Sequence, residues 1–244
     1  MRSLIIKSIL LLFPILLIGC AKESAVFEKH IPDDRIKSQV ESFLLLDSQL
    51  PDVAITADVN GGTVKLNGTV TNFRELHRVV ADVKKVAGVK DIVNNLKVVP
   101  GVRGDDLILD DVRNAIKRNA ELQNVAVVVK VKNGEVTLTG KVSSYLQKQL
   151  AQGVAENTYG TRNVENDLTV VPAKPRSDSQ IKADIEHFFK LDRLVHSNIM
   201  VDVKDGVVTL TGQVKDFGEM DSALEDASLA TGVRDVVNHM TLAP

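Results

Sequence analysis

A chain of 244 residues can form one large domain or several small ones. Its formal net charge of −2 excludes a protein that binds nucleic acid through an overall positive charge, although it leaves local basic patches possible. Cys20 is the single cysteine, so an intrachain disulfide is excluded.

The N-terminal 20 residues have the layout of a secretory signal, in which basic Arg2 and Lys7 precede an apolar run over residues 9–18. This run contains Pro14 and is shorter than the roughly 18 residues that a membrane-spanning helix needs. We therefore expect cleavage after residue 19 rather than a permanent span.

The end of this segment, Leu17–Cys20, resembles a bacterial lipobox, whose cysteine is lipid-modified and becomes the mature N-terminus. An ordinary signal peptide with a chance cysteine is the alternative. We expect Cys20 to be a lipid anchor and residues 20–32, which are polar and aperiodic, to be a tether. No aspartate follows the cysteine, which by resemblance to Gram-negative sorting favours the outer membrane.

The rest of the chain repeats with an interval of 72 residues, since GTVKLNGTV at 62–70 returns as GEVTLTGKV at 134–142 and GVVTLTGQV at 206–214. Apolar residues alternate within each copy, as in a half-buried strand. We expect the glycines of the repeats to be structural. They are Gly62, Gly134 and Gly206 in hairpin turns, Gly68, Gly140 and Gly212 within strands where another backbone comes close or the strand bulges, and Gly88, Gly160 and Gly232 after helices.

Each copy begins with residues at helical spacing, such as Ile36, Val40 and Leu44, behind an acidic helix start. Two strands follow, joined by the glycine turn. A second helix comes next, and its polar residues at N-cap and N3 resemble a capping box in every copy. These pairs are Asn72 with Glu75, Ser144 with Gln147 and Asp216 with Glu219. A third strand closes each copy, so the predicted order is αββαβ.

This order, with the closing pattern GVKDIVNNL at 88–96, resembles the BON domain of bacterial envelope proteins. The resemblance implies an α+β fold of three tandem αββαβ domains, each a three-stranded mixed sheet packed with two helices. We expect the domains at residues 33–100, 107–172 and 178–244.

Relatives in this family are envelope proteins with two such domains, for which phospholipid binding, envelope integrity and chaperone-like assistance have been proposed. The resemblance thus implies a lipid-anchored protein on the periplasmic side of the envelope, with membrane phospholipid as a partner and other envelope proteins as further candidates. A periplasmic chaperone or protein-interaction scaffold is the alternative, and the exposed apolar residues expected at Leu45, Leu46 and Phe188–Phe189 would suit it.

Charge differs between the copies. Residues 33–100 have 9 basic and 9 acidic residues (net 0), residues 108–172 have 8 and 7 (net +1), and residues 178–244 have 6 and 12 (net −6). An acidic copy should be repelled by anionic lipid. We therefore expect the middle copy to bind lipid headgroups through Arg113, Lys117 and Arg118, although an ordinary solvated helix face would have the same sequence.

Motifs for catalysis are missing from the sequence. The five histidines form no i, i+4 pair and no Cys–His pair, so we expect no metal and no cofactor. Neither a Gly-x-Ser-x-Gly turn nor a phosphate-binding glycine loop occurs. We predict a non-enzymatic binding module with no small-molecule substrate and no nucleic-acid partner, while the sequence leaves its oligomeric state open.

Overall fold

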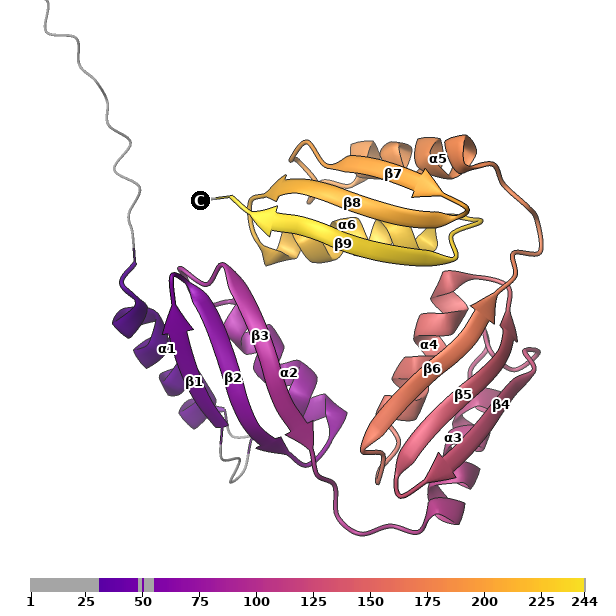
Figure 1. Ribbon diagram of the computed structural model, residues 1–244, viewed down its shortest axis with the longest axis horizontal. Helices are drawn as coiled ribbons and strands as arrows, with labels where there is room; N and C mark the ends of the chain where they lie inside the picture. Colours follow the sequence, from indigo (N-terminus) through magenta and orange to yellow (C-terminus); the bar gives the residue numbers. More distant parts are fainter. Residues whose placement is uncertain (1–30, 48–49, 51–54, 244) are drawn as a thin grey trace, which may run out of the picture.

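The computed structural model describes residues 31–47, 50 and 55–243, which form three units with the same αββαβ order (Figure 1). This confirms the predicted α+β class. The expected signal peptide, the tether and Cys20 lie outside the described residues, apart from the last two residues of the tether. Within the described part of the chain, no helix is long and apolar enough to cross a membrane.

Each unit, called a repeat below, has five elements. Repeat 1 consists of α1 (Asp33–Leu46), β1 (Ile55–Asn60), β2 (Thr63–Val70), α2 (Phe73–Lys84) and β3 (Asp91–Val98). Repeat 2 consists of α3 (Asp105–Arg118), β4 (Val127–Lys132), β5 (Glu135–Val142), α4 (Tyr145–Glu156) and β6 (Asn163–Val170). Repeat 3 consists of α5 (Asp178–Leu191), β7 (Met200–Lys204), β8 (Val207–Val214), α6 (Phe217–Leu229) and β9 (Asp235–Leu242).

The middle strand of each sheet pairs antiparallel with the strand before it and parallel with the strand after it. In repeat 1, Val64 lies opposite Val59 on one side and Ile92 on the other. Both helices pack on the same face of the sheet, and the other face is open (Figure 1). The alternation seen in the sequence therefore separates a buried row, such as Val64 and Leu66, from an exposed polar row.

Each repeat has its own core between the sheet and its two helices. In each repeat, one apolar residue that follows the first helix is part of this core. These residues are Leu50, Leu122 and Val195, each at most 7% exposed. The second helices of repeats 2 and 3 contribute alanines, such as Ala151 and Ala223, where repeat 1 has Val79, all of them fully buried. Smaller side chains let these two helices lie close to their sheets.

The hairpin turn of each repeat is held by the first helix. The Asp33 carboxylate accepts hydrogen bonds from the backbone N–H groups of Gly61 and Gly62 at 2.8 and 3.0 Å. Asp105 binds the turn of repeat 2 and Asp178 that of repeat 3 in the same way, at 2.8–2.9 Å. These aspartates therefore do more than favour a helix start electrostatically, because they fix the helix to the end of the hairpin.

The caps of the second helices differ in one bond from the predicted capping box. The N-cap side chain accepts from the N3 backbone as expected, for example Asn72 from Glu75 at 2.9 Å. The N3 side chain instead accepts from the residue before the N-cap, since Glu75 binds the N–H of Thr71 at 2.7 Å. A complete capping box occurs at α5, between Ser177 and Gln180.

The glycine inside each middle strand stands where another backbone comes close. Gly140 pairs with Val127 at a φ of +134°, and a Cβ at Gly140 would lie 2.4 Å from the carbonyl oxygen of Ala126. That separation is too short for any side chain. The pairing of β4 with β5 ends at Gly140, whereas the pairing of β5 with β6 continues past it, so the strand has no bulge on the β6 side.

We predict that Gly140→Ala lowers the free energy of unfolding of repeat 2 by about 2 kcal/mol or more, because it adds both a clash and backbone strain. Gly153→Ala in α4 is the control in the same repeat. A Cβ at Gly153 meets no atom within 4 Å, so alanine should stabilise the helix by roughly 0.5–1 kcal/mol. Hydrogen exchange of repeat 2 amides measures both, with repeats 1 and 3 as internal references. Equal effects of the two alanines would contradict the assignment.

Candidate functional site

The basic residues predicted to bind lipid lie together on α3. This helix buries Ile108, Val112 and Ile116 against its sheet, and Arg113, Lys117 and Arg118 point away from that core. We call these three residues the α3 basic surface. All three are exposed, and within residues 31–47, 50 and 55–243 none of them takes part in an ion pair or side-chain hydrogen bond that would neutralise it.

The equivalent helices of the other repeats have different residues at these positions. The three first helices have 14 residues each, so their positions correspond one to one. Repeat 1 has Glu41, Leu45 and Leu46, and repeat 3 has Glu186, Lys190 and Leu191. Among the three first helices, only α3 thus has a cation at all three of these positions. Lys117 and Arg118 also lie in the last turn of α3, where a cation is favoured by the helix dipole.

The apolar residues expected to be exposed, which are Leu45, Leu46, Phe188 and Phe189, fall into two groups. Leu45 and Leu46, at the end of α1, are 86% and 82% exposed. Phe188 and Phe189, in contrast, are half-buried and pack against the core of repeat 3. Leu191, which follows them, is 67% exposed. The ends of α1 and α5 therefore each present exposed leucine.

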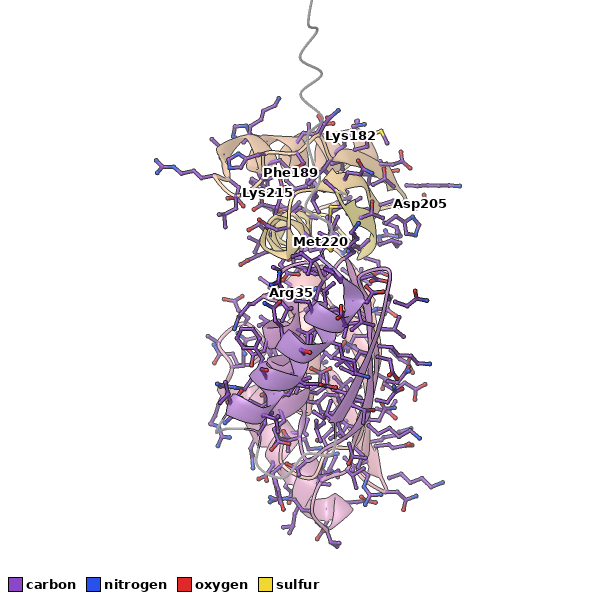
Figure 2. The ribbon with its side chains drawn as sticks, turned by 90° about the vertical axis from the view of Figure 1, so that its left-hand side faces the viewer. Arg35, Lys182, Phe189, Asp205, Lys215 and Met220 are labelled. Atoms are coloured by element: carbon purple, nitrogen blue, oxygen red, sulfur yellow. The ribbon has the colours of Figure 1, made fainter. Side chains whose placement is uncertain are left out.

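Repeats 1 and 3 are in contact although all of repeat 2 separates them in the sequence. The second helix of each repeat faces the centre of the molecule (Figure 1). Lys84 at the end of α2 binds both carboxylate oxygens of Asp221 on α6, at 2.7 and 2.8 Å, and lies 5.5 Å from the centre of the Phe217 ring. Phe217 packs against the core of repeat 1. Figure 2 places Met220, on the same helix, on the side of repeat 3 toward repeat 1.

Repeats 2 and 3 are joined through the start of α4. Tyr145 is half-buried and packs against the core of repeat 3. Burial raises the pKa of its hydroxyl, and the nearby carboxylate of Asp235 raises it further. Helices α4 and α6 also lie against each other.

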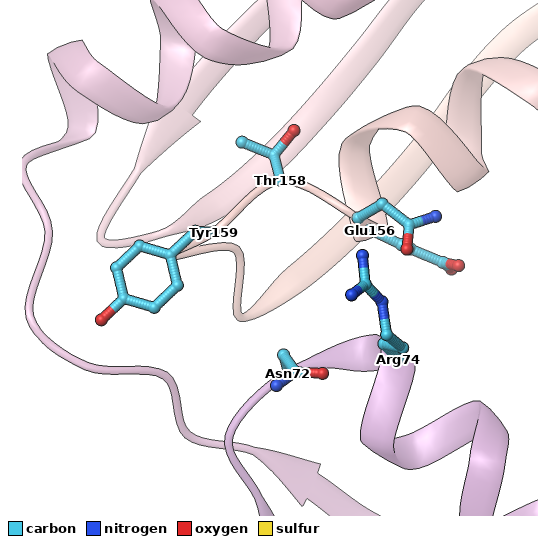
Figure 3. A pocket seen from close by; sticks show the side chains of 6 residues that line it. Asn72, Arg74, Glu156, Thr158 and Tyr159 are labelled. Carbon is cyan, nitrogen blue, oxygen red and sulfur yellow. The ribbon is translucent and has the colours of Figure 1, made fainter. Parts of the chain in front are cut away.

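Repeats 1 and 2 meet through a polar contact. His77 on α2 lies 3.0 Å from a carboxylate oxygen of Glu156 on α4, measured from the ring Nε2 to Oε2. Beside this pair is a cavity of about 240 Å³, lined by Asn72, Arg74 and residues 156–159. In Figure 3 the guanidinium of Arg74 points from the start of α2 toward Glu156.

These joints could not be predicted from the sequence. The residues of the His77–Glu156 and Lys84–Asp221 pairs lie 79 and 137 positions apart. They are ordinary polar residues. His77 is equivalent to Asp221 and Lys84 to Glu156 at the 72-residue interval, but the residue types at these positions differ between repeats. Only the three-dimensional arrangement of the repeats brings them together.

A buried carboxylate distinguishes repeat 3. Glu219, at N3 of α6, is 3% exposed and accepts hydrogen bonds from the N–H groups of His196, Ser197 and Lys215 at 2.6–2.7 Å. Desolvation alone would raise the pKa of Glu219, but these hydrogen bonds lower it to about 2. The carboxylate therefore ties the loop before β7 to the start of α6.

No group of metal-ligating side chains is present in the part of the chain that the structure describes. His77 is paired with Glu156, and His196 contributes its backbone N–H to Glu219. His30 lies outside the described residues. The structure presents the α3 basic surface and three joints between repeats.

Comparison with known proteins matches each repeat to one family model. Residues 32–100, 104–172 and 177–244 each match the model described as the BON domain. Among curated proteins, the osmotically-inducible protein Y of Escherichia coli (strain K12) is 27% identical over 206 residues, which cover 81% of this chain and 96% of the relative.

Two of the solved structures found by comparison come from type III secretion systems. CdsD, a structural protein of the type III secretion system of Chlamydia trachomatis, is 19% identical, with 85% of this chain and 91% of that chain covered and a TM-score of 0.25. The periplasmic domain of PrgH from S. typhimurium is 13% identical, with 83% and 100% covered and a TM-score of 0.21. At these TM-scores neither structure informs the function of the chain.

We predict that Glu219→Gln destabilises repeat 3, because a glutamine amide must turn its NH2 group toward N–H donors. The carboxylate contributes at most about 3 kcal/mol above its unfolded pKa of 4.5, and this contribution is lost as the pH falls toward its folded pKa of about 2. Calorimetry should therefore show a large difference between the proteins at pH 7 and little near pH 2. Gln147→Glu, the reverse exchange in repeat 2, is the control for a charge change at N3. A difference that persists at pH 2 would contradict this role.

Proposed function

Because the chain belongs to the BON-domain family and has three copies of that domain, we propose that it is a non-enzymatic lipoprotein of the bacterial envelope that binds membrane phospholipid and supports envelope integrity under stress. The name of the osmotically-inducible relative supports a role in envelope stress. We place the protein on the periplasmic side, anchored through Cys20 to the outer membrane.

The α3 basic surface is the observation that carries the lipid proposal. Its three cations are exposed and unpaired within the described residues, and a basic residue near an anionic membrane surface contributes roughly 1 kcal/mol. Arg103, which precedes α3, is in contrast held by the carboxylate of Asp111. Repeat 3, with its net charge of −6, and the acidic residue Glu41 on α1 make the other first helices poorer sites for anionic headgroups.

Lipid anchoring and headgroup binding would act together. A single acyl chain gives weak, reversible attachment, whereas several chains, or one chain and a basic patch, hold a protein stably at a bilayer. The anchor at Cys20 would keep the repeats near the membrane, and the α3 basic surface would then select anionic lipid. This division explains how a surface of only three charges can suffice.

The alternative function, an interaction scaffold or chaperone, is favoured by Leu45 and Leu46, whose exposures of 86% and 82% are high for leucine on a folded domain. If this function applies, the chain should suppress aggregation of an unfolding client protein, and Leu45→Ser with Leu46→Ser should abolish that effect. Light scattering of the client measures it. Suppression that the double variant retains would exclude this surface.

We predict that the chain with Cys20→Ser floats with vesicles of anionic phospholipid at low salt and dissociates as salt rises, because Debye screening weakens exposed charges. Changing Arg113, Lys117 and Arg118 to Glu should reduce the bound fraction at least about tenfold. The matched control changes the exposed lysines of the open sheet face in the same repeat, Lys130, Lys132 and Lys141, to Glu. Equal losses in both triple variants would indicate nonspecific attraction, and no binding to anionic vesicles would exclude the lipid proposal. The unmutated chain, if anchored, should float at all salt concentrations.

A further inference from the structure

The three joints between repeats contain different ionisable groups. Repeats 1 and 3 are held by an ammonium–carboxylate pair, Lys84 with Asp221, and by the Phe217 ring. Repeats 2 and 3 are held by Tyr145 and by packing of α4 on α6. Lysine and aspartate side chains do not ordinarily titrate between pH 5.5 and 8.5, and apolar packing does not titrate at all. Among the described residues, only the joint between repeats 1 and 2 contains a histidine in an ion pair.

We propose that the contact between α2 and α4 is a pH-dependent joint, closed when His77 and Glu156 are both charged and weakened at alkaline pH, while the other two joints stay closed. Closure brings the imidazolium within 3.0 Å of the carboxylate. Glu156 is well placed for this role, because its side chain is only 12% exposed and its other oxygen accepts from Gln152 at 2.9 Å. The acceptor is therefore fixed on α4, and the histidine, 58% exposed on α2, is the group that changes charge.

The charged groups around His77 determine the direction of the effect. Glu156 faces it from α4. On its own helix, Arg74 lies one turn before it and Arg78 directly after it, but Arg78 is engaged by Asp47 from the end of α1. The hydrogen bond to Glu156 raises the pKa of His77, and partial burial opposes this. Burial alone would raise the pKa of Glu156, but hydrogen bonds from His77 and Gln152 lower it.

The pH range in which the joint is strongest follows from the directions of these two pKa shifts. A raised pKa for His77 means that its contribution is complete below the unfolded value of 6.5 and is lost as the pH rises through the folded value. A lowered pKa for Glu156 means that its contribution is complete above 4.5 and is lost as the pH falls through the folded value. The joint is therefore strongest between pH 4.5 and 6.5. Above this window a neutral imidazole can still donate one hydrogen bond, so the contact weakens without disappearing.

The test measures the distance between repeats in the full chain with Cys20→Ser and two fluorophores. Lys65→Cys and Lys130→Cys place one dye on the exposed sheet face of repeat 1 and one on that of repeat 2. Between pH 5.5 and 8.5, the ratio of open to closed molecules should rise by up to about fivefold, the range of an exposed ion pair. A second pair, Lys65→Cys with Asp202→Cys, spans repeats 1 and 3 and should report the same distance at both pH values.

His77→Gln is the decisive variant, since glutamine keeps a donor for Glu156 but cannot become charged. It should give a similar ratio of open to closed molecules at pH 5.5 and 8.5, and circular dichroism should show that the repeats remain folded. An unchanged distance between repeats 1 and 2 in the parent protein would overturn the proposal. So would a pH response that His77→Gln retains, because another group would then be titrating. Neither result bears on vesicle binding by the α3 basic surface.

Discussion

The structure depends on one carboxylate per repeat, at the start of the first helix, that binds both N–H groups of the hairpin turn. Tight turns of this kind leave two backbone donors pointing outward, and an ionised acceptor satisfies both at once. Because Asp33, Asp105 and Asp178 are helical residues, each bond also fixes the direction of the first helix across the sheet. The second helix then has one remaining place on the sheet, and its outer face becomes available for contacts with other repeats.

Much of this fold could be predicted because it is local and occurs three times. Alternation in the strands, the glycine turns and the capping residues each indicate their own element, and repetition every 72 residues removes most ambiguity. The carboxylate–turn bonds were not predicted, because they join residues 28 or 29 apart in repeat 1, and an aspartate at a helix start already has a sufficient local reason. The sequence likewise did not predict that the side chain of Glu75 binds Thr71 instead of completing the expected capping box.

The sequence predicted which basic residues make up the candidate site, but it did not predict the contacts between repeats. Charge counts indicated repeat 2, and the structure places Arg113, Lys117 and Arg118 on the exposed side of α3. No sequence pattern indicates that Glu156 meets His77, or that Phe217 packs on the core of repeat 1. Such contacts depend on how whole domains sit against each other, and the residue types at the equivalent positions differ between repeats, so the sequence has no periodic signal for them.

Contact between the first and last repeats gives the molecule the connectivity of a closed loop. In an open string of domains, losing one weak contact frees everything beyond it. Here a repeat that loses one partner is still held by the chain and by a second neighbour, through Lys84 and Asp221 or through Tyr145. The separated surfaces stay at millimolar effective concentration, so a contact too weak to hold two free proteins can close again quickly. Small joints are therefore enough to keep three small domains associated while leaving each joint reversible.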